Sequence, residues 1–214
     1  MAIASRSRHD HLHRRGVADL PASCYEPAPV PRYVLALAVI AGCQGRSEPD
    51  PPRPPRQVIE ARANGTTTAR IVAGHPCRAD VNGDELLVGT EPLVAQVGNS
   101  RWSGDDADDG TTLRKDGAPI VRLRDLADSS VEVFDPRGGA LLRVSADGTV
   151  ANARGEVVRR AEASPAALKI GDSVVTGTSD LALGVLVTAP ELIPEVRALA
   201  ACHRLFTREQ AARK

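Results

Sequence analysis

Cys77–Gly89, CRADVNGDELLVG, is the stretch that decides the fold class of this chain. Short apolar runs lie on either side of Asn82-Gly83, and an Asn-Gly pair between two alternating runs is the strongest short-range indication of a type I′ hairpin turn. We therefore expect two antiparallel strands here, joined by a two-residue turn.

The same pattern recurs further along the chain. In Thr112–Asp125, TLRKDGAPIVRLRD, the turn pair is Asp116-Gly117, and in Leu141–Arg160, LLRVSADGTVANARGEVVRR, it is Asp147-Gly148. Apolar runs separated by turn residues every eight to twelve positions, from residue 57 to about 176, are typical of an antiparallel sheet, sandwich or barrel. The spacing is too irregular for a solenoid, so these hairpins predict a β-meander.

The period changes near the C-terminus and predicts helices. Thr188-Ala189-Pro190-Glu191 matches a capping box with proline in the first turn, so a helix is expected from Glu191 or Pro194 to Ala212, after a shorter one at about 180–187. One helix face collects the apolar residues Ala198, Leu199, Cys202, Leu205 and Phe206. The predicted fold class is mostly β (α+β): an antiparallel β-meander, sandwich or small barrel with a C-terminal helical segment packed on it.

Composition bounds the function. The 214 residues carry 27 basic and 27 acidic side chains, so no overall field attracts nucleic acid, and none is expected as a partner. Aromatic residues make up 2% of the chain, too few for sugar-stacking platforms or single-strand nucleic-acid grooves. We expect the one tryptophan, Trp102, to fill the core.

A second informative stretch is Tyr33–Arg56, YVLALAVIAGCQGRSEPDPPRPPR. Its apolar run, residues 33–42, has about half the roughly 20 residues that a membrane-spanning helix needs. Such a run, with Arg32 in front of it, is typical of a signal peptide. The proline-rich part that follows favours an extended spacer that buries nothing.

Ile40-Ala41-Gly42-Cys43 resembles the lipobox of bacterial lipoproteins. In that family the cysteine thiol is diacylglycerated, the signal is cleaved before it, and the new amino terminus is acylated. The resemblance implies that Cys43 is the lipidation site and that a membrane is a partner through this lipid. Because Gln44 is not aspartate, it also implies a bacterial envelope protein at the outer membrane or cell surface. The alternative is a cysteine that ends a short buried strand.

The leader before this run is longer than in the lipoprotein family. Met1 is the only methionine, and Val30 could be encoded by a GTG start. We expect residues 1–29 to be an unstructured leader outside the true start, 30–42 a signal peptide, 43–56 a tether, and 57–214 a single β-rich domain. Peptides from residues 9–32 in the native protein would contradict the later start.

Two cysteines would remain free after cleavage and lipidation, Cys77 and Cys202. A pair of cysteines in an exported chain predicts a disulfide, which would join the first clear hairpin to the last helix. The alternative is a zinc site made with the neighbouring histidines, from His75, Cys77, Cys202 and His203. Neither spacing is usual for zinc, and a helix points His203 about 100° away from Cys202. We therefore expect His75 to be a turn residue, His203 a helix flank position, and no metal.

Two acidic stretches and one histidine cluster contain residue types that bind metals, but a metal site is not the favoured interpretation of any of them. The first stretch, with Asp105, Asp106, Asp108 and Asp109, could gather oxygen ligands for calcium, although an acidic surface loop is the simpler interpretation. The second, with Asp80, Asn82, Asp84 and Glu91, matches EF-hand ligand positions, but Glu85 stands where that loop needs glycine, which favours the hairpin. The histidine cluster, His9, His11 and His13, lies in the leader.

No nucleophile elbow, phosphate loop, dinucleotide fingerprint or zinc-protease motif occurs, so no catalytic residue and no cofactor is predicted. The expected function is that of a lipid-anchored envelope protein that displays a β-rich binding or structural domain, with a possible protein partner in the envelope. An envelope enzyme with an unrecognised site and a metal-binding accessory protein remain alternatives. A concave pocket where polar side chains converge would favour the enzyme.

Overall fold

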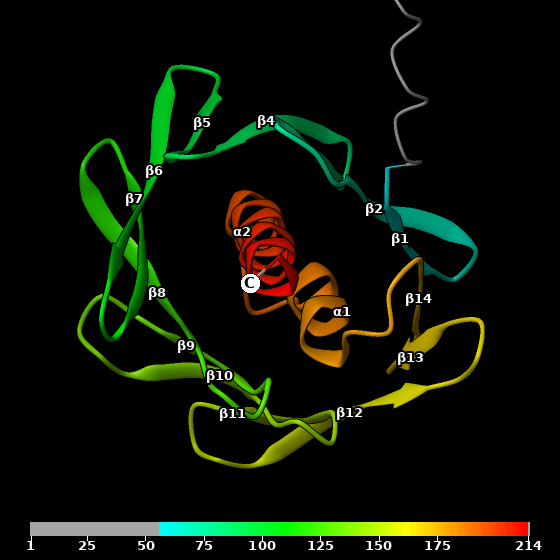
Figure 1. The fold of residues 1–214 in the computed structure, drawn as a ribbon. Coiled ribbons are helices and arrows are strands. Elements are labelled where there is room, and N and C mark those ends of the chain that lie inside the picture. The colour runs from blue at the N-terminus through cyan, green and yellow to red at the C-terminus, as the bar shows by residue number, and fades with distance from the viewer. Residues whose placement is uncertain (1–55, 214) are drawn as a thin grey trace, which may run out of the picture. The chain divides into compact units, whose positions relative to one another are not determined.

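A closed antiparallel barrel forms the body of the protein, in a computed structural model that describes residues 56–213. Every strand pairs with its neighbours in sequence, and the last strand pairs with the first (Figure 1). The strands are β1 (Val58–Ala63), β2 (Thr66–Val72), β3 (Cys77–Val81), β4 (Asp84–Thr90), β5 (Leu93–Val97), β6 (Ser100–Ala107), β7 (Gly110–Lys115), β8 (Ala118–Asp125), β9 (Val131–Phe134), β10 (Ala140–Val144), β11 (Thr149–Asn152), β12 (Val157–Ala163), β13 (Leu168–Ile170) and β14 (Ser173–Thr176).

Alternation along the strands divides them into an inner and an outer face. In β3, Cys77, Ala79 and Val81 are buried, whereas Arg78 and Asp80 between them are exposed. Trp102 of β6 is fully buried, as expected. The predicted mostly β, antiparallel fold class is therefore confirmed, and the meander closes into a barrel with no free sheet edge.

Two helices fill the inside of this barrel. Figure 1 shows α1 (Leu181–Thr188) and α2 (Pro194–Ala212) surrounded by the ring of strands. α1 packs against β12 and β13, and α2 packs against β3 and β4. Every residue of α2 from Val196 to Arg204 is buried, so this part of the helix has no solvent-facing side. The prediction of a single docking face was therefore too narrow, because the wall surrounds the helix instead of meeting it on one side.

The start of α2 differs from one of the two expected positions. The helix begins at Pro194 with Ile193 as N-cap, so the predicted capping box at residues 188–191 does not start it. Thr188 instead ends α1, and its hydroxyl donates to the carbonyl oxygen of Gly184 at 3.0 Å. The carboxylate of Glu191 accepts from Arg159 on β12 at 2.7 Å. These two side chains therefore tie the loop between the helices to α1 and to the wall.

Two of the three predicted type I′ turns are confirmed. Asn82-Gly83 has φ angles of 56° and 88°, and Asp116-Gly117 has φ angles of 51° and 82°, as a type I′ turn requires at both positions. Asn64-Gly65, between β1 and β2, is a further turn of this kind that was not predicted.

The third predicted turn, at Asp147-Gly148, has a different form. Only Gly148 has a positive φ, at 83°. The N–H of Gly148 donates to the carbonyl oxygen of Ser145, and the N–H of Ser145 donates to the carbonyl oxygen of Thr149. This is a longer loop closed by a left-handed glycine, not a two-residue turn. The Asp147 carboxylate accepts from the backbone N–H of Thr149, which holds the pKa of Asp147 below its usual range.

Gly177 lies at the seam where β14 meets β1. Its φ is +82°, and a Cβ at this position would collide with the carbonyl oxygen of Val58. Gln57 donates to the carbonyl oxygen of Gly177 at 2.8 Å, which adds a side-chain contact across the seam.

Gly177→Ala is expected to destabilise the barrel more than a left-handed glycine change elsewhere. Both Gly177→Ala and the control Gly65→Ala force alanine into a positive φ, but a Cβ at Gly65 meets no atom within 4 Å. The overpacking at Gly177 should cost a further 1–3 kcal/mol or so, measured by urea unfolding. Equal losses in the two variants would contradict a tight seam.

The connections alternate between the two ends of the barrel. We call the end where β1 begins and β14 finishes the proximal end; the connections there are 73–76, 91–92, 108–109, 126–130, 145–148 and 164–167. α2 points its C-terminal part toward this end, because Gln210 donates to Glu91 at 2.7 Å. Both ends of the described chain therefore leave the barrel on the proximal side.

Candidate functional site

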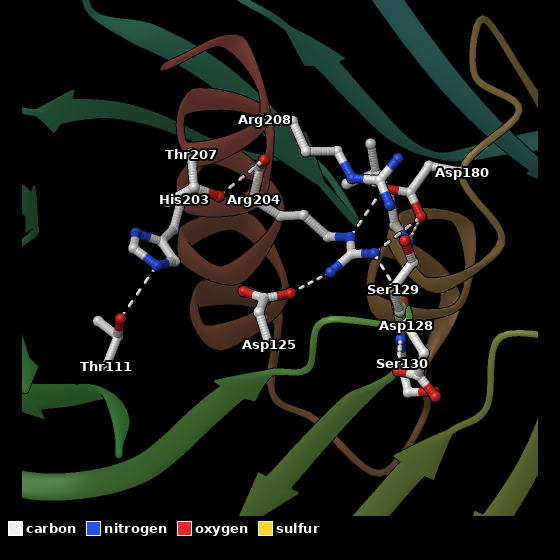
Figure 2. Close-up of polar contacts among 11 residues, drawn as sticks. Thr111, Asp125, Asp128, Ser129, Ser130, Asp180, His203, Arg204, Thr207 and Arg208 are labelled. Carbon is white, nitrogen blue, oxygen red and sulfur yellow. Dashed lines mark hydrogen bonds and ion pairs between the residues drawn. The ribbon is translucent and has the colours of Figure 1, made fainter. Parts of the chain in front are cut away.

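Arg204 is the centre of a polar cluster at the proximal end (Figure 2). It projects from α2, its side chain is 4% exposed, and its guanidinium binds the Asp180 carboxylate through Nε at 2.7 Å and Nη2 at 3.1 Å. Nη1 binds Asp125 at the end of β8, and Nη2 also donates to the carbonyl oxygen of Ser129 at 3.0 Å. One buried cation thus connects the central helix to the wall and to the segment before α1.

Asp180 receives more donors than any ordinary surface carboxylate. It is the N-cap of α1, where its Oδ1 accepts from the N–H of Leu183 at 3.2 Å. Arg208 Nε lies 3.0 Å from its Oδ2, in addition to the two contacts from Arg204. With both oxygens occupied, Asp180 is a structural anchor and is not free to act as a base.

His203 lies one residue before Arg204 and contacts β7, the strand that pairs with the Asp125 strand β8. Its Nε2 is 3.0 Å from the hydroxyl of Thr111 on β7, and that hydroxyl donates to Asp106 on β6 at 2.6 Å. Because the single hydroxyl proton goes to Asp106, His203 Nε2 must carry a proton and donate to Thr111. His203 is buried inside the barrel mouth, so its expected flank position was wrong: the wall surrounds this helix turn completely.

Burial lowers the pKa of His203, while the charges of Asp106 and Asp125 act in the opposite direction. An unfolded histidine titrates near pH 6.5. Below that value the unfolded chain takes up a proton that the folded state resists, so stability falls as pH decreases.

The unfolding free energy is therefore expected to drop between about pH 7 and pH 5, and less so in His203→Gln. Urea unfolding of both proteins across this range measures the difference. Carboxylates with a lowered pKa, such as Asp116, change the stability only below the normal carboxylate range. They therefore do not contribute to the pH dependence between about pH 7 and pH 5. An identical pH dependence in the variant would contradict the assignment.

The disulfide expected between Cys77 and Cys202 is present. Their Cα atoms are 5.9 Å apart, and both residues are buried. The bond fixes α2 to β3 one residue before His203, on another part of the wall from the Arg204 contacts. The zinc alternative fails on this observation, since sulfurs joined to each other are not thiolate ligands.

A cavity of about 510 Å³ opens at the proximal end beside this cluster. Arg56 precedes β1, Ser179 comes from the segment after β14, and Leu183, Leu205 and Arg208 come from the two helices. We call this hollow the proximal cavity. It is a concave site where several polar side chains converge, which is the feature expected to favour the enzyme alternative.

His75 lies at the edge of the proximal cavity, in the loop between β2 and β3. Its Nδ1 lies 2.6 Å from the hydroxyl of Thr90, its Nε2 lies 3.8 Å from Glu209, and its ring meets Phe206 edge to face. Both His75 and Glu209 also line a second hollow of about 330 Å³. The pair therefore forms a side-chain bridge between two adjoining hollows.

The acidic residues considered as calcium ligands lie along a hairpin. Asp105 pairs with Arg114, Asp109 pairs with Arg122, and Asp106 accepts from Thr111. Asp80 and Asp84 flank the confirmed β3–β4 turn. Within residues 56–213 no group of three or more potential ligands is placed to hold a metal. His9, His11, His13 and Cys43 lie outside the described residues.

Sequence reasoning missed the residues that make up this site. Arg204, Asp180 and Asp125 are far apart in the chain, and arginine is the usual cation here, so none of them stood out. The one available indication was α1: LALGVLVT is apolar all around, which is typical of an internal helix. Such a helix needs a wall on every side.

The comparisons add no family to this description. The chain matches no protein-family model, no curated protein and no solved structure. The fold and the site define a class of protein by architecture alone. It is a closed antiparallel barrel with an internal C-terminal helix, and a disulfide and a buried ion cluster fix this helix to the wall at one end.

Proposed function

We propose that this protein is a lipid-anchored component of a bacterial cell envelope, whose barrel serves as a binding module. The lipid is carried by Cys43, residues 43–56 are the tether, and the barrel is held at the outer membrane or cell surface. No helix within residues 56–213 has both the length and the apolar character to cross a bilayer. Attachment is assigned to the lipid.

The observation that carries the proposal is the Cys77–Cys202 disulfide. Structural disulfides form and persist in oxidising compartments and are rare in the cytosol. This one is buried between wall and central helix, where it has a structural role. It supports export, as do the lipobox-like residues before Cys43, and the two lines of support are independent of each other.

The binding role is supported by how the barrel is filled. α1 and α2 occupy the interior, so a ligand must bind at an end or on the outer face. At the proximal end the proximal cavity offers cationic, hydroxyl and apolar groups together. The barrel around it is closed and cross-linked, which suits a rigid display module.

Cell fractionation tests the anchor. Native protein is expected in the membrane fraction, whereas Cys43→Ser should move to the soluble fraction and retain its signal peptide. Cys24→Ser is the matched control, because it removes a cysteine outside the proposed mature chain and should change nothing. Globomycin, which blocks cleavage of the signal, should leave a longer precursor that still carries the diacylglyceryl group on Cys43 and stays in the membrane fraction. A soluble native protein, or a Cys43→Ser variant that stays on the membrane, would refute the lipid anchor.

A second candidate, an envelope enzyme, is favoured by the concave shape of the proximal cavity and by the arrangement around His75. Thr90, His75 and Glu209 form a hydroxyl–imidazole–carboxylate row beside the proximal cavity. Thr90 is buried, so it orients the ring and does not reach a substrate; His75 would act as a base toward water. Hydrolysis of activated esters that is lost in His75→Gln would support this candidate, whereas equal rates in both proteins would eliminate it.

A further inference from the structure

The proximal cavity has cationic groups on its sides and apolar groups beside them. Arg56 has no carboxylate within ion-pair distance among the described residues, and its guanidinium lies 3.6 Å from the position that a Cβ on Gly74 would occupy. Arg208 contacts Asp180 through Nε, and its side chain is 46% exposed. Its terminal nitrogens make no hydrogen bond within the described part of the chain. Two guanidinium groups thus present donors to one hollow.

The two carboxylates that line the proximal cavity have partners of their own. Asp180 is bound by Arg204 and Arg208, as described above, and is only 7% exposed. Glu209 accepts from Arg213, the C-cap residue of α2, and faces His75 on its other side. Among residues 56–213 neither of these carboxylates pairs with Arg56, so Arg56 adds a positive charge that the described lining of the cavity does not neutralise.

Leu183 and Leu205 supply the apolar part of the lining. Leu183 is buried in α1, while Leu205 is half-buried at the point where α2 leaves the barrel. A volume of about 510 Å³ is within the usual range of small-molecule sites. The lining therefore suits a molecule with a charged head and an apolar body more than a bare inorganic ion.

We propose that the proximal cavity binds a small organic carboxylate with an apolar body, held by Arg56 and Arg208 over Leu183 and Leu205. A guanidinium matches a carboxylate in geometry, with two parallel N–H donors to its two oxygens. The hydroxyl of Ser179 adds a neutral donor on the same lining. This proposal rests on the binding role proposed above, but not on the lipid at Cys43.

NMR titration of the purified full chain tests the site, with hexanoate as the probe. Hexanol, which has the same apolar body without the charge, and inorganic phosphate, which has charge without the body, are the comparison ligands. Hexanoate is expected to bind more tightly than either. Arg56→Gln and Arg208→Gln should each weaken hexanoate by about tenfold, the usual effect of losing a charge-assisted hydrogen bond.

Arg101→Gln is the matched control, because Arg101 is an exposed residue of β6 outside the lining of the proximal cavity, and this variant should bind hexanoate normally. Neither test variant threatens the fold: Arg56 precedes the first strand, and Arg204 still holds Asp180 when Arg208 is changed. Thermal melts verify this. Absence of hexanoate binding, equal binding of hexanol or phosphate, or unchanged binding in both arginine variants would each overturn the proposal. Fractionation of Cys43→Ser is independent of all these outcomes, so a failed anchor and a failed cavity are told apart.

Discussion

Arg204→Met should lower the unfolding free energy by about 3–5 kcal/mol, the range for removing one partner of a buried charge pair. Methionine preserves the unbranched stem but removes every donor of the guanidinium. Asp180, which is 7% exposed, then loses its bidentate partner, and the carbonyl oxygen of Ser129 loses its donor. Urea unfolding of the oxidised protein measures the loss.

Arg208→Met is the matched control for this prediction. It lies one turn further on the same helix, contacts the same carboxylate through Nε, and is half-exposed. Its loss should cost no more than about 1 kcal/mol, as is usual for exposed ion pairs. If Arg208→Met and Arg204→Met were equally destabilised, burial of the Arg204 contacts would not explain their importance.

Removing the disulfide by Cys77→Ala with Cys202→Ala is the second large change, expected to cost about 2–5 kcal/mol. The two cysteines are 125 positions apart, so the bond closes a long loop and removes much freedom from the unfolded chain. Alanine fits both sites without adding a polar group to the core. Urea unfolding with and without reductant gives the measurement.

The reductant supplies the internal control. It should destabilise native protein to about the level of the double variant and leave the double variant unchanged. A native protein that is insensitive to reductant after full unfolding and refolding would show that the bond does not stabilise this fold.

Local pattern predicted the strands and most turns, but not the closure of the barrel. The turn pairs at Asn82-Gly83 and Asp116-Gly117 act over a few residues, and there the prediction was right. The pairing of β1 with β14, such as Ala61 with Val175, joins positions more than a hundred residues apart. No short-range feature of either strand specifies that partner, so sheet, sandwich and barrel remained equally compatible with the sequence.

The polar cluster was unpredictable for a related reason. His203 and Arg204 occupy adjacent positions on one helix, yet His203 contacts Thr111 on β7, whereas Arg204 binds Asp180, which follows β14. Both contacts depend on the helix being enclosed, because a helix packed on one face would leave one of these side chains in water. Once the helix is placed inside the wall, a buried arginine and a buried histidine require polar partners at the same depth.

The internal position of the helices also determines when this protein can fold. The fourteen strands of the wall precede α1 and α2 in the chain, so they are synthesised first. Until residues as far as Arg204 are available, buried wall residues such as Ile59, Leu86 and Leu168 lack the helices that pack against their strands. A nascent chain therefore cannot complete this domain step by step from its N-terminus. Completion of the folded domain therefore waits for the last segment of the chain.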